Sequence, residues 1–273
     1  MDILVCIKQV PGTSRVEIDP ETGTLKRDGV RAKLNPYDLN AIEMALALRD
    51  RVGGTVRCVT MGPPQAAQAV MDAVYMGVDS GVVISDRAFA GADVYATSYT
   101  LAQGIGRLGA FDVIFCGKQT TDGDTGQVGP EVAELLDIPH VANVTRIDEI
   151  AAGYCDVCAN QDDSEARLRV KMPCLLGVDS DANTPRQPDA GRKENLAQDD
   201  VVSKIALNDL ADTDESHYGL GASPTQVERI FAPEKNTARE MFEGNAEQMA
   251  EALYRVLAEN GFVSGEETRK TDQ

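Results

Sequence analysis

The residues of this sequence with the clearest chemical potential lie in a glycine-rich stretch, Gly117 to Pro130, which reads G-K-Q-T-T-D-G-D-T-G-Q-V-G-P. An apolar run, 111–116, precedes this stretch as a predicted buried strand, and a helix is expected to begin with Pro130 in its first turn. Glycines let the backbone approach a ligand closely, and free amides at the start of a helix attract anions such as phosphate. The stretch therefore predicts a nucleotide-binding loop, with a plain polar loop rich in turn residues as the alternative.

The charges in this stretch argue against a simple phosphate-binding loop. A carboxylate about 4 Å from a phosphate charge costs roughly 4 kcal/mol at an effective dielectric of 20, so Asp122 and Asp124 should face away from phosphate. We expect these two side chains to cap turns or to accept hydrogen bonds from ribose hydroxyls or an adenine. Thr125, Gln127 and the glycine amides are then expected to meet the phosphates, and Lys118 adds one positive charge.

Two other motifs fit a structural role better than a chemical one. The stretch 104–109 matches G-x-G-x-x-G, but it closes a predicted helix, whereas the dinucleotide fingerprint follows a strand and opens a helix. Cys155 and Cys158 form a C-x-x-C pair inside a predicted strand, where residues three apart point to opposite faces. His140 and His217 are the only histidines, so no zinc ligand set is complete and no metal site is predicted.

The elements that must position the glycine-rich loop alternate between short apolar runs and segments of helical period. This alternation predicts an α/β fold, a doubly wound and mostly parallel sheet of the Rossmann-like, adenine nucleotide-binding kind. Asn35 is expected to cap the first helix, and the charge of Asp38 to meet its dipole. The runs are 3–7, 36–50, 55–61, 65–76, 81–84, 93–108, 111–116 and 130–137.

Three strand ends should meet at one edge of this sheet. Cys6-Ile7-Lys8 leads toward the helix start at 35–38, and Thr60-Met61-Gly62 ends the strand that begins at 55. The loop that begins at Gly117 follows a third strand. Ligands of open α/β sheets bind in a crevice at the carboxyl ends of the strands, so these loops predict a single nucleotide site.

The second half of the chain predicts additions to the α/β domain, which is taken as residues 1–180. Two strands around the turn 161–164 predict a β-hairpin extension within 150–172, before the apolar run Cys174 to Val178. Residues 181–200 contain prolines and few apolar side chains, which predicts an exposed loop of the recognition type. Residues 201–273, with a helix near 246–259, predict a C-terminal tail that packs on a partner subunit.

Composition excludes several classes of protein. The 273 residues are 42% hydrophobic and 26% charged, which is ordinary for a globular chain. The net charge of −18 repels nucleic acid and anionic membrane surfaces, so neither is an expected partner. No apolar segment suggests membrane insertion or a signal peptide, and the six cysteines are spread through apolar runs, so a cytoplasmic location is expected.

Five stretches in a defined order resemble a known family: V-C-I-K-Q-V (5–10), N-P-Y-D (35–38), M-G-P (61–63), G-K-Q with D-G-D-T-G-Q-V-G-P (117–130), and G-A-S-P-T-Q-V (221–227). Over nearly the whole chain they resemble the β subunit of electron transfer flavoproteins. The resemblance implies a heterodimer with a homologous α subunit that carries a redox-active FAD. It also implies a second nucleotide in this subunit, either AMP as a structural ligand or, in electron-bifurcating members, FAD that takes hydride from NADH.

The loop D-G-D-T-G-Q-V-G-P together with N-P-Y-D resembles the bifurcating or anaerobic type more than the mitochondrial type, which favours FAD over AMP here. The resemblance and the strand-end argument together define the expected cofactor-binding residues. These are Cys6, Lys8, Asn35, Tyr37, Asp38, Met61, Gly117, Lys118, Thr120, Asp122, Gly123, Asp124, Thr125, Gly126, Gln127, Val128, Gly129 and Pro130.

The segment after Val178 departs from the family pattern. Members that dock acyl-CoA dehydrogenases have a proline-arginine-tyrosine recognition loop with an apolar anchor, whereas Pro185-Arg186 here continues without either, and Leu196 is the only apolar candidate nearby. Apolar anchors supply much of the binding energy of an interface, so the expected redox partner is a flavin-dependent dehydrogenase or reductase other than a typical acyl-CoA dehydrogenase. Two alternatives are a stand-alone nucleotide-binding stress module and a nucleotide-dependent transferase, for which Lys8 and Lys118 are the only candidate cations.

Overall fold

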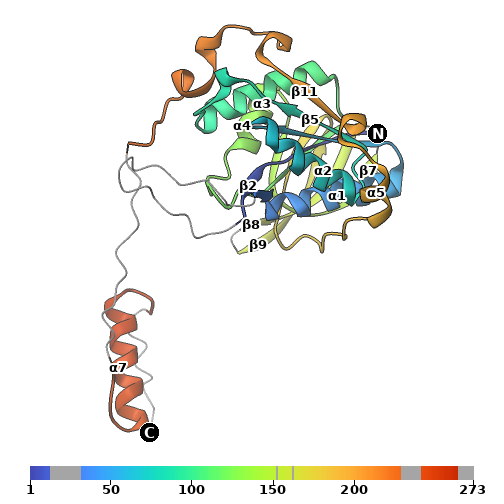
Figure 1. Cartoon of the computed structure of the whole chain (residues 1–273). Helices are drawn as coiled ribbons and strands as arrows, with labels where there is room; N and C mark the ends of the chain where they lie inside the picture. The colour runs from blue at the N-terminus through green and yellow to red at the C-terminus, as the bar shows by residue number, and fades with distance from the viewer. Residues whose placement is uncertain (13–31, 152, 162, 229–240, 264–273) are drawn as a thin grey trace. The chain divides into compact units, whose positions relative to one another are not determined.

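The computed structural model describes residues 1–12, 32–151, 153–161, 163–228 and 241–263, in two units, Met1–Ile230 and Phe231–Gln273 (Figure 1). A nine-stranded sheet forms the centre of the first unit, in the order β11-β5-β4-β1-β6-β10-β7-β8-β9. Its strands are β1 (Asp2–Cys6), β4 (Thr55–Met61), β5 (Ser80–Ile84), β6 (Val113–Gly117), β7 (His140–Ala151), β8 (Tyr154–Gln161), β9 (Ser164–Lys171), β10 (Cys174–Val178) and β11 (Val202–Ile205).

Every pairing from β11 to β7 is parallel, and the pairings of β7 with β8 and of β8 with β9 are antiparallel. A small antiparallel pair, β2 (Gln9–Pro11) with β3 (Ala32–Leu34), lies outside the main sheet. The doubly wound, mostly parallel α/β fold expected from the alternation of apolar runs is therefore confirmed.

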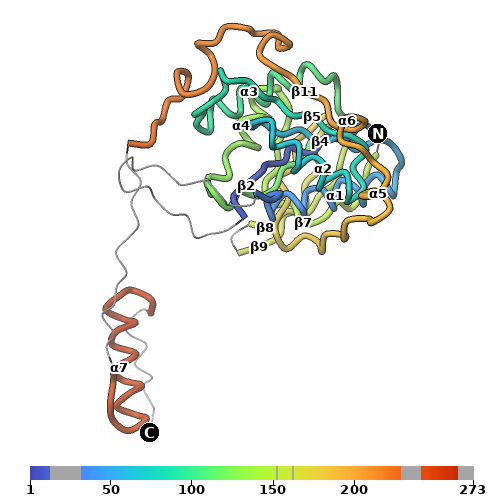
Figure 2. Tube along the Cα trace, in the orientation of Figure 1, coloured from blue at the N-terminus to red at the C-terminus, as the bar shows by residue number. Residues whose placement is uncertain are grey.

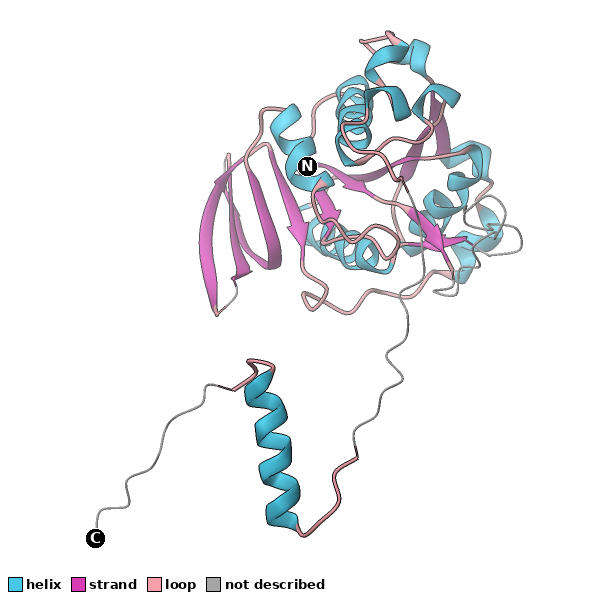
Figure 3. Cartoon of the chain, turned by 90° about the vertical axis from the view of Figure 1, so that its left-hand side faces the viewer, coloured by secondary structure: helices cyan, strands magenta, loops and turns pink. Residues whose placement is uncertain are grey.

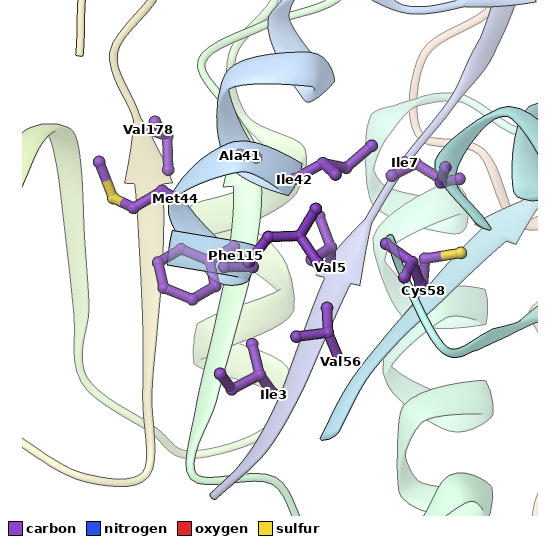
Figure 4. Packing of buried hydrophobic residues seen from close by; sticks show 14 of the residues in the cluster. Ile3, Val5, Ile7, Ala41, Ile42, Met44, Val56, Cys58, Phe115 and Val178 are labelled. Atoms are coloured by element: carbon purple, nitrogen blue, oxygen red, sulfur yellow. The ribbon is translucent and has the colours of Figure 1, made fainter. Parts of the chain in front are cut away.

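Helices cover both faces of the sheet. Along β1, Ile3 and Val5 belong to one buried cluster with α1 (Pro36–Val52) and α2 (Ala67–Met76), because alternate side chains of a strand point to opposite faces. Figure 4 shows Val5 near Ile42 of α1, and Ile3 farther along β1 beside Val56. Leu4 belongs to a second cluster with α3 (Val94–Leu108) and α4 (Val128–Leu135). Continuous burial explains why these strands are apolar at every position.

The antiparallel end of the sheet is larger than the sequence predicts. The expected hairpin is present as β8 and β9, but β7, which pairs with both β10 and β8, was not predicted as a strand. In β7 the half-buried Ile147 and Ile150 alternate with exposed Arg146 and Glu149, so its apolar signal is weak. Figure 3 shows these strands extending from the helix-covered part of the sheet.

Residues 181–200 are mostly exposed, as expected, but they are held on the first unit and contain α5 (Ala190–Asn195) and α6 (Gln198–Val201). Arg186 donates from Nε to Glu43 Oε2 at 2.8 Å and from Nη2 to Asp50 Oδ2 at 3.0 Å, and both carboxylates belong to α1. Leu196 packs against the buried cluster beneath α1 and α2. Figure 2 traces this segment along α1 and α5.

Residues 202–225, which the sequence places in a partner-binding tail, lie on the first unit instead. Ile205 belongs to β11, the edge strand beside β5, and Leu207, Leu210 and Tyr218 complete the buried cluster around α3. The single-turn segments Leu207–Asp209, Glu215–His217 and Gly219–Ala222 carry these side chains. Short irregular turns have no periodicity, which explains why the sequence pattern did not reveal this part of the core.

The second unit contains α7 (Ala246–Glu259), the helix expected near 246–259. Asn245 caps it, since its side chain accepts a hydrogen bond from Gln248 N. Met249, Leu253 and Tyr254 are exposed large apolar side chains on this helix. No helix among the described residues is both long and apolar enough to cross a bilayer.

Candidate nucleotide-binding site

The expected site residues gather where the strand order of the sheet reverses. From β1 the chain passes to β4 and β5 on one side, then returns to β6 on the other side. Cys6 and Cys116 lie opposite each other at the carboxyl ends of these neighbouring parallel strands. In open α/β sheets, ligands bind in the crevice at this point, and the loops after β1 and β6 open from it here.

Asn35 stands at the start of α1, yet it does not cap the helix with its side chain, contrary to the sequence expectation. Its side chain is fully buried, and Nδ2 donates to Gln119 O at 2.8 Å and to Asp38 Oδ1 at 2.9 Å. Its Oδ1 accepts from Thr121 N at 3.4 Å. The Asn35 side chain therefore bonds to Gln119 and Thr121 across the crevice and does not cap α1.

Asp38 is also buried, with 4% of its surface exposed. Its Oδ2 accepts a hydrogen bond from Lys8 N at 2.7 Å. Burial raises the pKa of this carboxyl from 3.8 to about 7, although the hydrogen bonds from Asn35 and Lys8 oppose the shift. The raised pKa disfavours the charged form of Asp38, which weakens the expected interaction of its charge with the helix dipole.

Gly117 lets the end of β6 approach the start of α1 closely. A Cβ atom at this position would lie 2.8 Å from Tyr37 C and 2.9 Å from Asp38 N. Both atoms belong to the backbone, so they cannot rotate out of the way. The absence of a side chain at Gly117 therefore sets the width of the crevice on this side.

The two carboxylates of the loop after β6 are bonded to protein side chains. Asp122 forms an ion pair with Lys8, whose Nζ lies 2.7 Å from Oδ1. Asp124 has a positive φ of 51°, its N donates to Thr120 O at 2.9 Å, and its Oδ1 accepts from Gln119 Nε2 at 3.1 Å. The loop is therefore held by bonds among its own residues and by the ion pair with Lys8.

Two residues of this edge were missed by sequence reasoning. Gln119 links Asp124 to Tyr37, whose hydroxyl lies 3.2 Å from Gln119 Nε2. Asp179 pairs with Lys118 at 3.3 Å, so both candidate cations of the crevice have carboxylate partners. The position of Asp179 directly after the apolar run that forms β10 could have indicated it, because parallel strands share their carboxyl edge.

The outer part of the loop presents backbone amides. Asp122 to Gln127 are exposed, and α4 begins at Val128 with no side-chain cap among the described residues. Val128 and Gly129 therefore present free amides at the start of the helix, whereas Pro130 has no N–H. Gly126 has a φ of 64°, which favours glycine, and Pro130 lies in the first turn as expected. Thr125 and Gln127 come directly before this helix, and Gly129 lies in its first turn. Such an arrangement suits an anionic ligand.

Cys6 and Met61 end neighbouring strands on the floor of the crevice. Cys6 is buried, and Met61 is half-buried against the cluster around α3. A polar cleft of about 520 Å³ adjoins the crevice at Lys118. It is lined by Lys118, Asn143, Asn160, Gln161, Ser164, Asp179, Ser180 and Asp181.

The G-x-G-x-x-G and C-x-x-C motifs, for which the sequence favours a structural role, lie in a helix and in a strand. Gly104 and Gly106 lie inside α3, and Gly109 ends it. Cys155 packs in the cluster beneath α1, whereas Cys158 donates from Sγ to Asp148 Oδ2 on the neighbouring strand, so the two thiols have different surroundings. All six cysteines are buried and free.

Comparisons with known proteins agree with the resemblance. A family model described as the electron transfer flavoprotein domain matches residues 22–203, which is more than half of the chain. The electron transfer flavoprotein subunit beta of Thermoanaerobacterium thermosaccharolyticum is 42% identical over 257 residues, covering 94% of this chain and 98% of the relative.

Two further relatives carry other names. Subunit CarD of a caffeyl-CoA reductase-Etf complex from Acetobacterium woodii is 41% identical over 265 residues, covering 96% of this chain and 100% of the relative. Protein FixA of Bradyrhizobium diazoefficiens is 39% identical over 264 residues, covering 93% of this chain and 90% of the relative.

Proposed function

This chain belongs to the electron transfer flavoprotein family, as a β subunit, and from that membership we propose that it holds an adenine nucleotide in the crevice between β1 and β6. Its role in electron transfer follows from the family. The observation that carries the proposal is the exposed loop after β6, which leads into the uncapped start of α4. This loop lies at the switch point of the sheet, the place between β1 and β6 where the strand order reverses.

The residues of the crevice fit a ligand with one phosphate group, such as AMP, or with a pyrophosphate, such as FAD. Gly117 lets the end of β6 lie close to the start of α1, and the loop carboxylates that would repel a phosphate are bonded to Lys8 and Gln119. Thr125, Gln127 and the amides at the start of α4 would bind the phosphate oxygens. FAD, when bound, supplies the redox chemistry itself, while the chain binds it, orients it and limits its contact with water.

We favour FAD over AMP in this subunit. A polar surface cleft shares Lys118 with the crevice, and a relative of 41% identity is named as part of a caffeyl-CoA reductase-Etf complex. With FAD, the chain would be the half of an electron-bifurcating carrier that accepts hydride from NADH. With AMP, it would be a structural nucleotide holder in a simple carrier.

The partner that we propose for the heterodimer is an α subunit carrying a further FAD, since the relatives are named as β subunits. The second unit offers the contact surface, because Met249, Leu253 and Tyr254 expose apolar area on α7. The buried free cysteines are typical of a reducing compartment, which supports a cytoplasmic location.

The redox partner that we propose is a flavoenzyme other than a typical acyl-CoA dehydrogenase. Leu196, the only apolar candidate for a docking anchor in 181–200, is partly buried in the core of its own chain. The nearby Arg186 is bonded to Glu43 and Asp50. Neither side chain is free to fill a pocket on a partner.

Counting nucleotides in the purified heterodimer tests this proposal. The chain is co-expressed with its α subunit, the non-covalent ligands are extracted, and FAD and AMP are quantified per heterodimer. We expect two FAD. One FAD with one AMP would leave the nucleotide site in place but contradict bifurcation, and a heterodimer with no nucleotide beyond the α-subunit flavin would contradict the site itself.

Substitutions in the loop should lower retention of this nucleotide without loss of the α-subunit flavin. Asp124→Ala removes the acceptor for Gln119, and Gly123→Leu places a branched side chain where a Cβ would already lie 3.3 Å from Thr120 Oγ1. We expect retention to fall about tenfold, equivalent to roughly 1.4 kcal/mol. Gly221→Leu is the matched control, since nothing lies within 4 Å of a Cβ there. Equal retention in all three variants would remove this loop from the site.

A further inference from the structure

We propose that Asn35 is a positioning residue, which shapes the nucleotide-binding loop and makes no contact with the nucleotide. The inference rests on the proposed function, because it assigns how that site is built. Asn35 was expected to contact the ligand, yet none of its side chain is exposed. A side chain without accessible surface acts on a ligand only through the groups that it holds.

The hydrogen-bonding capacity of the Asn35 amide is spent on protein groups. Its two N–H groups donate to Gln119 O and to Asp38 Oδ1, at 2.8 and 2.9 Å. Its oxygen accepts from Thr121 N at 3.4 Å. An asparagine amide has two donors and one carbonyl oxygen, so both donors are occupied and the oxygen faces the loop.

These bonds join three segments that are far apart in the sequence. The backbone N of Asn35 donates to Lys8 O at 2.9 Å, which ties the start of α1 to the chain that leaves β1. Gln119 and Thr121 belong to the loop that leaves β6. Asn35 therefore connects the segment after β1, the start of α1 and the loop after β6.

The effect of Asn35 extends to the exposed part of the loop through Gln119. With its backbone oxygen held by Asn35, Gln119 reaches Asp124 and the Tyr37 hydroxyl with its side-chain amide. Asp124 adopts a positive φ and closes a turn onto Thr120. A disturbance at Asn35 would thus move the amides that are proposed to meet the phosphates.

Asn35→Asp is the sharpest test, because the shape is kept while both donors are lost. A carboxylate oxygen would face Gln119 O and Asp38 Oδ1, and a buried acceptor without a donor is costly. We expect the affinity of the nucleotide-stripped heterodimer for AMP and for FAD, each titrated separately, to fall about 10- to 100-fold. Hydrogen exchange of the amides in 118–127 should become faster in the same variant.

Asn40→Asp is the matched control. Asn40 lies on the same helix, is 8% exposed, and donates from Nδ2 to Asn183 O at 3.0 Å, away from the loop. Both variants replace a buried asparagine amide with a carboxyl group, so any general loss of folding stability should appear in Asn40→Asp as well as in Asn35→Asp. Affinity for AMP and FAD should remain within about twofold of wild type in Asn40→Asp.

The double variant Asn35→Asp with Asp38→Asn tests whether the bond to Gln119 O carries the effect. The amide at position 38 donates to the carboxylate at position 35, and its oxygen accepts from Lys8 N, so the bond between the two side chains returns while the donor to Gln119 O stays absent. We expect nucleotide affinity and exchange protection in 118–127 to stay low in this variant. Full recovery of both would overturn the inference, because the bond between positions 35 and 38 alone would then account for the effect.

Wild-type affinity retained in Asn35→Asp would overturn the inference, as would lost affinity with unchanged exchange in 118–127. Equal losses in Asn35→Asp and Asn40→Asp would also overturn it, since the effect would then be general. These results leave the proposed function standing, because the wild-type heterodimer still binds nucleotide. A wild-type heterodimer that binds neither AMP nor FAD would overturn both proposals.

Discussion

The contribution of Asp38 to the stability of this chain should fall as the pH rises from 4 to 7, and Asp38→Asn should remove that fall. Asp38 has a pKa raised to about 7, chiefly by burial, against 3.8 when exposed. The folded state therefore binds one proton more than the unfolded state between these values, and its stability decreases as that proton is lost. At about 1.4 kcal/mol per pH unit the contribution amounts to about 4 kcal/mol at most.

The role of Asp38 is identified by how the difference in free energy of unfolding between wild type and Asp38→Asn changes with pH, not by the size of that difference at one pH. In Asp38→Asn, the new amide accepts from Lys8 N but presents a donor to Asn35 Nδ2, which costs a hydrogen bond at every pH. This cost is constant, whereas the cost of a buried carboxylate grows above pH 4 and levels off above pH 7. Wild type should thus lose stability relative to the variant across this window.

Urea unfolding of the nucleotide-free chain, followed by circular dichroism at pH 5, 6, 7 and 8, measures this difference. Asp86→Asn is the control: Asp86 is an exposed cap whose pKa is lowered by hydrogen bonds from Ala88 N and Leu207 N. Asp86 is ionised from pH 5 to pH 8, so the difference in free energy of unfolding between Asp86→Asn and wild type should stay constant. Parallel curves for wild type and Asp38→Asn would show that Asp38 titrates normally.

The sequence predicted the parts of this fold whose signal is local. The apolar runs that became β1, β4 and β6 are buried on both faces, and α7 has a capping asparagine and an apolar stripe, so period and cap agree with the structure. The convergence of the loops after β1 and β6 was predictable as well, because parallel strands place their carboxyl ends on one edge.

What the sequence did not reveal depends on long-range contacts. Asn35 fits the pattern of a helix cap, but its partners, Gln119 and Thr121, lie more than 80 residues away. The altered pKa of Asp38 is likewise a consequence of burial that no local pattern encodes. Both misreadings fall at the switch point, where the bonds that shape the site replaced the bonds that local propensity favours.

A large loss of stability is expected when the side chain of Tyr218 is truncated, although the sequence assigned this residue to a tail with little core of its own. Tyr218 is 2% exposed, and its ring centroid lies 5.2 Å from that of Phe89 and 5.4 Å from that of Tyr99. Removing a buried aromatic side chain costs about 3–5 kcal/mol, the transfer free energy plus the cavity. Tyr218→Ala should lower the free energy of unfolding by that amount.

Two further variants assign the loss to burial. Tyr218→Phe keeps the ring and removes only the hydroxyl that donates to Asp212 O at 2.6 Å, so it should cost about 1 kcal/mol. Tyr154→Ala truncates a tyrosine that is 46% exposed on β8 and should cost well under half as much as Tyr218→Ala. Denaturant unfolding of the three variants gives these values directly.

The comparison decides where the body of this subunit ends. If Tyr218→Ala loses several kcal/mol, the residues around it unfold together with the sheet, as their place in the cluster with Leu4 and Ile105 requires. The segment free to bind a partner then starts beyond Thr225, whose amide and hydroxyl bond to Asp93 at 2.9 and 2.7 Å. If Tyr218→Ala and Tyr154→Ala cost the same, the segment from Leu207 to Thr225 rests on the surface and belongs with the partner-binding region.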